Sequence, residues 1–182
     1  MKLWEDIRNY FYRKAVERKL EGQNTKRVLT NLDDAETVGI LYDSTNPDND
    51  IIITRFAEQL RNDGKTVEIL GFINDSKIDH KADIAVFNKK TLGWTQVPQD
   101  ERIEKFAAKD FDLLFAAFTN VSLPLEYVAR IAKAKWRVGV YDDRKTDYYE
   151  MMIKMGDKTD LQYFVDQATH FLNKIHYDTK QA

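Results

Sequence analysis

The chain has no cysteine among its 182 residues. This absence excludes disulfide bonds, a cysteine nucleophile and thiolate ligands for a metal ion. Of the three histidines, His80 falls in a polar connection, and His170 and His176 are six residues apart. Because two histidines on one helical face need a spacing of about four residues, we predict no metal centre.

Glycine is also scarce, with seven residues in the whole chain. The loop from Asp43 to Asp50, which follows the first predicted strand, contains no glycine. A dinucleotide or P-loop site needs glycine there, because the backbone must approach the phosphates closely. The three aspartates of this loop, Asp43, Asp48 and Asp50, would also repel phosphate. We therefore predict no nucleotide cofactor, and no cofactor of another kind.

No uncharged run reaches the roughly 20 residues that cross a bilayer. Glu5 and Asp6 lie where a signal peptide needs its apolar stretch. Apolar residues make up 43% of the chain and charged residues 32%, a balance typical of globular proteins. The net charge of −2 gives no basic field that would attract nucleic acid. We expect a cytoplasmic protein whose partner is neither a membrane nor a nucleic acid.

Short apolar runs rich in β-branched residues alternate with segments of helical periodicity. The predicted strands are 37–42, 66–72, 82–87, 111–116 and 136–141, with 148–155 as a sixth at one edge. Strands that alternate with helices form right-handed βαβ units, so the sheet should be parallel. We predict a Rossmann-like three-layer α/β fold with a mostly parallel sheet of five to six strands, plus an N-terminal amphipathic helix.

The composition divides the chain into four parts. We predict a basic helix over residues 1–20, a polar tether over 21–35, one Rossmann-like domain over 36–177 and a frayed tail over 178–182. Within the domain, Asp50 is the expected N-cap of the helix that follows the first strand. Thr159 and Gln162 have the spacing of a capping box for the last helix.

The N-terminal helix carries an aromatic face, formed by Trp4, Ile7, Tyr10 and Phe11. This face fits two roles: it can bind a protein partner or a second copy of the chain, or it can pack on its own domain. A membrane surface is disfavoured by the acidic residues of the first turn. We interpret Trp94 as a residue that closes the edge of the core, and a stacking platform for a ligand as the alternative.

Ligands of open parallel sheets bind beyond the carboxyl ends of the strands, where the strand order reverses. The first and fourth strands are the expected neighbours at that point. The candidate ligand-binding residues follow the first, fourth and fifth strands: Asp43, Ser44, Asn46, Thr119, Asn120 and Asp142. Asp43 with Asp142 or Asp143 could hold magnesium, but such residues more often make turns and caps, and we favour that interpretation. No catalytic constellation is evident.

The order of several motifs resembles a known family. An aromatic basic helix is followed by TVGILYD, VEILGF, GW, FDLLFAAF and AKWRVGVYD. This order resembles a bacterial family, domain of unknown function 6913, and the resemblance covers nearly the whole chain. It implies a Rossmann-like fold and no established activity, so it assigns no functional residues.

A second resemblance is partial. Residues 111–142 are similar to the acceptor-side half of heptosyltransferases, in which a strand ending in Asp-Leu, a helix and an AK-R-GF motif occur in this order. The second domain of that class, which binds the nucleotide sugar, has no counterpart in the 182 residues. A shared fold does not carry function.

These observations favour a non-catalytic interaction or scaffold protein. The alternative is a protein that binds a small molecule of the sugar or nucleotide type, or a glycosyltransferase-like enzyme, with its site at the carboxyl ends of the first and fourth strands.

Overall fold

The computed structural model describes residues 2–23, 25–77 and 84–175. Six strands form one sheet in the order β3-β2-β1-β4-β5-β6, and every neighbouring pair is parallel. The strands are β1 (Thr37–Asp43), β2 (Thr66–Ile73), β3 (Ala85–Asn88), β4 (Phe111–Ala117), β5 (Ala134–Val140) and β6 (Met151–Ile153). This order is that of Rossmann folds and confirms the predicted fold class, including the contact between the first and fourth strands.

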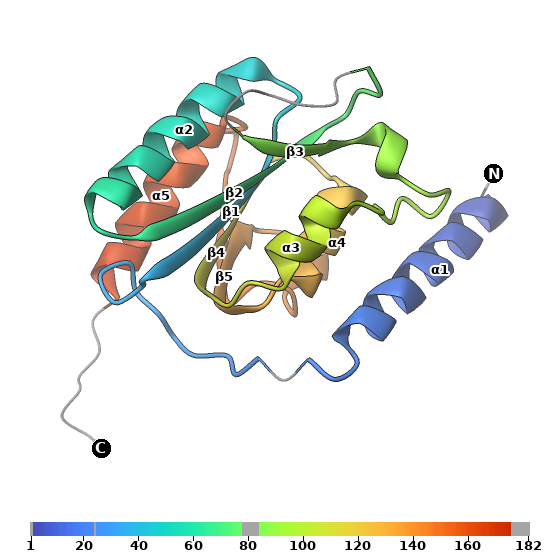
Figure 1. The fold of residues 1–182 in the computed structure, drawn as a ribbon, viewed down its shortest axis with the longest axis horizontal. Helices are drawn as coiled ribbons and strands as arrows, with labels where there is room; N and C mark the ends of the chain where they lie inside the picture. Colours follow the sequence, from blue (N-terminus) through green and yellow to red (C-terminus); the bar gives the residue numbers. More distant parts are fainter. Residues whose placement is uncertain (1, 24, 78–83, 176–182) are drawn as a thin grey trace.

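Helices cover both faces of the sheet (Figure 1). They are α1 (Lys2–Leu20), α2 (Pro47–Asn62), α3 (Glu101–Ala107), α4 (Leu123–Ile131) and α5 (Leu161–Lys174). Helices α2 and α5 pack on one face and α3 and α4 on the other, which divides the apolar core into two clusters. Helix α1 lies outside α4 as a further layer (Figure 1).

The two central strands explain why the sheet forms. From Val38 to Tyr42, every residue of β1 is buried, as expected of a parallel strand covered on both faces. A Cβ atom on Gly39 would lie 2.9 Å from the Leu114 Cδ1 atom, so this position requires glycine for close packing of β1 and β4. The apolar run around Gly39 thus fixes the centre of the fold.

The predicted N-cap of α2 was wrong. The helix begins at Pro47, and the Asn46 Oδ1 atom caps it by accepting the backbone N–H of Asp48 at 3.1 Å. Proline suits the first helical position, because its fixed φ angle is helical and its missing N–H would have no partner there. The Asp50 carboxylate instead accepts hydrogen bonds from Tyr42 and Ser44.

The predicted N-cap of the last helix, α5, also differs from the observed one. Asp160 is its N-cap, and the Asp160 Oδ1 atom accepts the backbone N–H of Tyr163 at 2.8 Å. The predicted capping box of Thr159 and Gln162 is therefore wrong, because a carboxylate one residue later takes the cap position. Gln162 instead donates to the Asp166 carboxylate one turn further on.

The sheet edges are shorter than predicted. Strand β6 has three residues, Met151–Ile153, within the expected range 148–155. Strand β3 begins at Ala85, and the first two residues of its predicted range, 82 and 83, lie outside the described residues. His80, His176 and the predicted tail 178–182 lie outside them as well.

Candidate functional site

Helix α1 packs on its own domain through one face. Tyr12 and Val16, which are four residues apart, are buried in the core cluster on the α4 side of the sheet. The Tyr12 hydroxyl donates to the carbonyl oxygen of Leu123 at 3.0 Å, and Lys19 pairs with Glu104 of α3 at 2.7 Å. These contacts hold α1 in a defined orientation on α3 and α4.

The predicted aromatic face points largely away from the domain. An α-helix turns by about 100° per residue, so Trp4 and Phe11 lie on a different side from Tyr12 and Val16. The exposed fraction is 74% for Trp4 and 71% for Leu3, while Ile7 is half-buried. The rings of Tyr10 and Phe11 are also exposed and lie 5.4 Å apart.

Trp94 joins this exposed surface. Its ring packs edge to face on Phe11, with 5.4 Å between the centroids, and 61% of the residue is exposed. The interpretation of Trp94 as a residue that closes the core is therefore wrong. We call Leu3, Trp4, Tyr10, Phe11 and Trp94 together the aromatic stripe. Isolated exposed apolar residues are common, but a contiguous group on one surface is typical of a binding site.

The carboxyl edge of the sheet uses part of the predicted ligand set for internal structure. Ser44 is buried, and its hydroxyl donates to the Asp50 carboxylate at 2.6 Å. Asn46 caps α2. The Asp142 carboxylate caps the short turn Asp143–Lys145 and pairs with Arg144 at 2.9 Å, and this hydrogen bond lowers the pKa of Asp142. Three of the six predicted side chains thus serve local structure.

Two other predicted residues line a groove beyond β1 and β4. Asp43 and Asn120 share a hollow of about 400 Å³ with Arg8 of α1 and with polar residues from three loops. We call it the carboxyl-edge groove, and its polar lining consists of Arg8, Asp43, Asn74, Gln96, Asn120 and Ser122. Its apolar lining includes Phe72 and Pro124. The structure thus places a mixed polar and apolar hollow where Rossmann-like folds bind ligands.

Thr119 lies in a smaller neighbouring hollow of about 200 Å³, which Asn120 and Asp142 also line. Lys145 lies in its wall and forms ion pairs with Glu126 at 2.6 Å and with Asp142 at 3.5 Å. The Tyr149 ring forms another part of the wall, and burial raises the pKa of its hydroxyl. The charges of this hollow therefore already satisfy one another.

Four polar residues of the groove are outside the predicted ligand set: Arg8, Asn74, Gln96 and Ser122. Arg8 is the charged one among them. Arg8 lines the groove together with Leu123 and Pro124 because α1 packs along α4, where the Tyr12 hydroxyl donates to the Leu123 carbonyl oxygen. The sequence between α1 and β1 does not predict on which helices α1 packs. In the part of the chain that the structure describes, no group of histidines and carboxylates is arranged to hold a metal ion.

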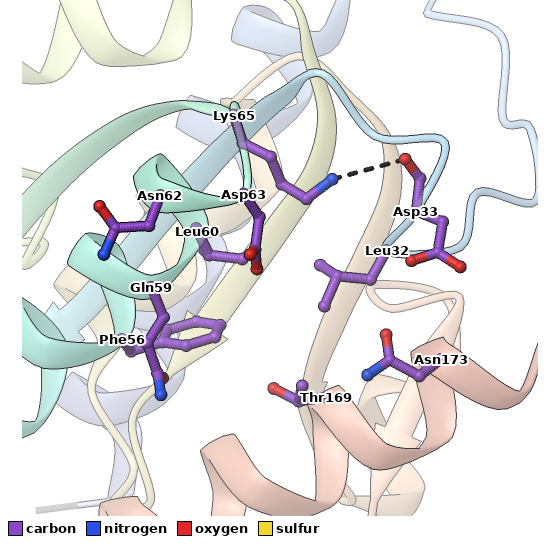
Figure 2. A pocket seen from close by; sticks show the side chains of 10 residues that line it. All are labelled: Leu32, Asp33, Phe56, Gln59, Leu60, Asn62, Asp63, Lys65, Thr169 and Asn173. Carbon is purple, nitrogen blue, oxygen red and sulfur yellow. Dashed lines mark hydrogen bonds between the residues drawn. The ribbon is translucent and has the colours of Figure 1, made fainter.

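A larger hollow of about 770 Å³ lies between the C-terminal halves of α2 and α5 (Figure 2). Amide and hydroxyl side chains line it, among them Gln59, Thr169 and Asn173. The Lys65 ammonium in its wall donates to the carbonyl oxygens of Ala35 at 2.9 Å and Asp33 at 3.5 Å. We interpret this hollow as a solvated seam between two helices at the amino edge of the sheet.

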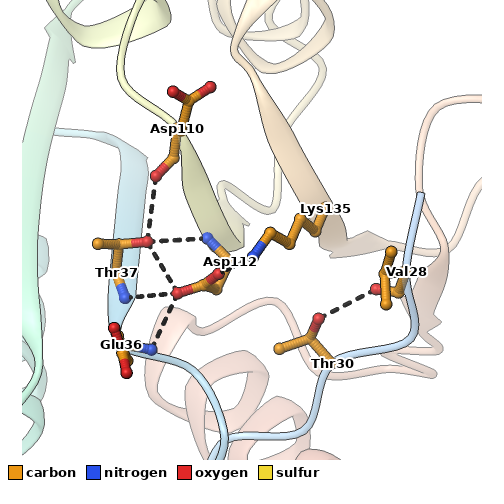
Figure 3. Close-up of polar contacts among 7 residues, drawn as sticks. All are labelled: Val28, Thr30, Glu36, Thr37, Asp110, Asp112 and Lys135. Atoms are coloured by element: carbon orange, nitrogen blue, oxygen red, sulfur yellow. Dashed lines mark hydrogen bonds and ion pairs between the residues drawn. The ribbon is translucent and has the colours of Figure 1, made fainter. Parts of the chain in front are cut away.

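A second feature of the amino edge is structural (Figure 3). The Asp112 carboxylate accepts hydrogen bonds from the backbone N–H groups of Glu36 and Thr37 and from the Thr37 hydroxyl, each at 2.9 Å. Lys135 donates to its other oxygen at 2.7 Å. Asp112 therefore ties together the first residues of β1, β4 and β5.

The six parallel strands, their order and the helices on both faces define a Rossmann-like α/β protein. The chain belongs to the family described as Family of unknown function (DUF6913), whose model matches residues 8–175. The family membership predicted from the order of motifs is thereby confirmed. None of the helices within the described ranges combines the length and the apolar character needed to cross a membrane.

Among solved structures, the chain is similar to Escherichia coli heptosyltransferase WaaC with ADP, at 14% identity and a TM-score of 0.41. The similarity covers 79% of this chain and 49% of that one, so this chain spans about half the length of the transferase. Curated proteins give no match.

Proposed function

We propose that this protein is a non-catalytic interaction module that binds a partner protein through the aromatic stripe. The observation that carries the proposal is the orientation of α1. Its Tyr12 and Val16 side anchors the helix to the domain, while Trp4, with 74% of its surface exposed, faces solvent. Large aromatic residues held on a rigid element are typical of the residues that dominate the affinity of protein interfaces.

The stripe also indicates the chemistry of the partner. Lys14 and Arg18 continue the same side of α1 beyond Phe11 and are exposed. A second copy whose twofold axis passes near Lys14 and Arg18 would bring the same cations together, where like charges repel, and Glu17 offsets only the charge of Lys14, at 3.0 Å. We therefore propose a different protein as the partner, with an apolar pocket bordered by carboxylates.

The proposal is tested by capture from a native lysate followed by reconstitution with the purified candidate partner. The double variant Trp4→Ala and Tyr10→Ala should lose binding at least tenfold, because both are exposed anchor residues. The matched control is Ile51→Ala and Phe171→Ala, which removes exposed apolar residues from α2 and α5, with exposed fractions of 59% and 47%. This control should bind as the wild type does.

Three results would contradict the proposal. In the first, both double variants bind the partner equally well, which would place the interface away from α1. In the second, anionic vesicles compete with the partner for the stripe, which would make a membrane surface its target. Sedimentation of the purified protein checks the remaining case, because a dimer that dissociates on stripe mutation would show that the partner is a second copy.

The carboxyl-edge groove favours a second candidate function, the binding of a small molecule. The supporting observation is a hollow of about 400 Å³, within the size range of ligand sites, that opens beyond β1 and β4. Calorimetric titration tests this function, with Asn120→Ala as the variant that should weaken binding. The control is Asn62→Ala, because Asn62 is exposed and lines the hollow between α2 and α5, not the groove.

A further inference from the structure

We propose that the carboxyl-edge groove binds a free amino acid, with the ligand carboxylate on Arg8 and the ligand ammonium group on Asp43. This inference rests on the second candidate function and names the class of ligand. It names a different ligand and a different site from the aromatic stripe, although Arg8 neighbours Trp4 and Phe11 on α1 at the four- and three-residue spacing.

Arg8 provides the first part of the argument. The residue is half-buried, and its Nε atom is buried without a hydrogen-bond partner among the described residues. No carboxylate of the described residues lies within 4.0 Å of its guanidinium. A guanidinium binds carboxylate groups through two parallel hydrogen bonds, and a buried N–H without an acceptor is costly. A ligand carboxylate would supply that acceptor.

Asp43 provides the second part. It is half-buried at the end of β1, and its Oδ1 atom accepts the backbone N–H of Thr45 at 2.9 Å. Within the described part of the chain, it forms no ion pair with a cationic side chain. Its second oxygen is therefore available for a ligand that donates hydrogen bonds.

The two charges together select the class of ligand. Arg8 and Asp43 line the same hollow but do not pair with each other. A phosphate ester would satisfy Arg8 and be repelled by Asp43, and a simple amine would do the reverse. An amino acid carries a carboxylate and an ammonium group on one carbon atom, so it satisfies both charges at once.

The remaining polar lining indicates a polar side chain on that amino acid. Asn74, Gln96 and Asn120 contribute amide groups to the groove, and Ser122 contributes a hydroxyl. Across the described residues, the side chains of these four form no hydrogen bond, and Ser122 leaves the first turn of α4 without a side-chain cap. Amide groups both donate and accept hydrogen bonds, which suits an amide or hydroxyl side chain on the ligand. We therefore choose L-glutamine as the probe.

The experiment is calorimetric titration of the full chain with L-glutamine and two of its analogues. Glutaramic acid lacks the ammonium group, and 4-aminobutanamide lacks the carboxylate. Each analogue should bind at least about tenfold more weakly than glutamine, since each loses a charge-assisted pair. Arg8→Gln should weaken glutamine by a similar factor but leave 4-aminobutanamide unchanged. Asp43→Asn should weaken glutamine and leave glutaramic acid unchanged.

Matched controls are available for both variants. Arg13→Gln removes an exposed cation from the same helix, and Asp48→Asn removes an exposed carboxylate from the first turn of α2, which follows Asp43 in the chain. Both should bind glutamine as the wild type does. Asp43→Asn keeps an oxygen that accepts the Thr45 N–H, so the loop should fold normally. Circular dichroism spectra and thermal midpoints check that each variant is folded.

The outcomes separate this inference from the function on which it rests. Equal binding of glutamine by the wild type and Arg8→Gln would overturn it, as would tighter binding of either analogue. If glucose shifts the backbone amide resonances of Asn74 and Asn120 and glutamine at millimolar concentration does not, the groove binds small molecules but the amino-acid assignment fails. If neither compound binds, the amino-acid assignment fails, while the second candidate function is judged separately by the Asn120→Ala titration.

Discussion

Asp112 shows how one side chain holds the amino edge of the sheet. Burial alone would raise the pKa of its carboxyl group, but hydrogen bonds from Lys135, Thr37 and Glu36 outweigh it and lower the pKa to about 2. The carboxylate receives four hydrogen bonds, from Glu36 N, Thr37 N, Thr37 Oγ1 and Lys135 Nζ. A carboxylate in such a network favours the folded state only while it is ionised.

We predict that Asp112→Asn lowers the free energy of unfolding by about 1–2 kcal/mol at neutral pH, because the backbone N–H groups of Glu36 and Thr37 and the Lys135 ammonium lose a charged acceptor. The pKa is lower in the folded state than the value of about 3.9 in an unfolded chain. The contribution is therefore complete above about pH 4 and is lost as the pH falls toward 2. Urea unfolding from pH 7 to pH 2.5 measures both effects.

The control for this prediction is Asp110→Asn, an exposed carboxylate two residues away. It should change stability little and keep the acid dependence of the wild type. If Asp112→Asn and the wild type lose the same free energy between pH 4 and pH 2.5, another group causes the acid dependence.

Gly139 gives a prediction about close packing. A Cβ atom at this position of β5 would lie 2.7 Å from three atoms of the buried Tyr149 ring. Gly139→Ala should therefore destabilise the protein by about 1–3 kcal/mol, as overpacking of a core does. In Gly93→Ala, the control, the nearest atom to the new Cβ is an ordinary 3.7 Å away. Thermal unfolding compares the two, and equal midpoints would show that Tyr149 moves aside without cost.

At the scale of elements, helix α1 has two faces with different roles. Val16→Ala should lower the free energy of unfolding by about 2 kcal/mol, because it leaves a cavity between α1 and the core. Trp4→Ala should stay within about 0.5 kcal/mol of the wild type, since an exposed residue contributes little to folding. Urea unfolding of both variants separates them. A large loss for Trp4→Ala would mean that the stripe supports the fold and is not reserved for a partner.

The sequence predicts the central residues of most strands and helices well, but it predicts the residues at which they begin and end less well. The apolar runs at 37–42, 66–72 and 111–116 become β1, β2 and β4, extended by one residue each. The sequence predicts Asp50 as the N-cap of α2, whereas the helix begins three residues earlier, at Pro47. Several residues between β1 and α2 have side chains that can cap a helix N-terminus. Which of them becomes the N-cap depends on where β1 ends.

Some contacts between helices and strands also could not be predicted from the local sequence pattern. Arg137 lies in an apolar strand pattern, but it is buried and its guanidinium donates to the carbonyl oxygens of Ala129, Ala132 and Ala134 near the end of α4. Burial, followed by the repulsion of Arg27, lowers the pKa of Arg137 to about 10. The need for these donors arises only once α4 stands beside β5, so β propensity alone could not reveal it.

At the scale of the whole molecule, part of the candidate site follows from the rule that parallel sheets bind ligands beyond the carboxyl ends of their strands, and part of it does not. The strand order places Asp43 and Asn120 at the carboxyl edge, as strand alternation led us to expect. Arg8 is distant in sequence from both, and only the packing of α1 along α4 brings it to the groove. A ligand on Arg8 would thus contact the helix that carries the aromatic stripe, which links the two proposed surfaces physically.

The layered architecture predicts an order of local stability. Strands β1 and β4 are paired on both sides and buried on both faces, whereas β6 has three residues and one neighbour. In native-state hydrogen exchange, the amides of Ile40 and Phe115 should exchange only through global unfolding. The amides of β6 should exchange through openings of lower free energy, because the fold keeps its core without that edge. Equal protection of β6 and β1 would instead show that the sheet opens only as one cooperative unit, with the edge as strongly held as the centre.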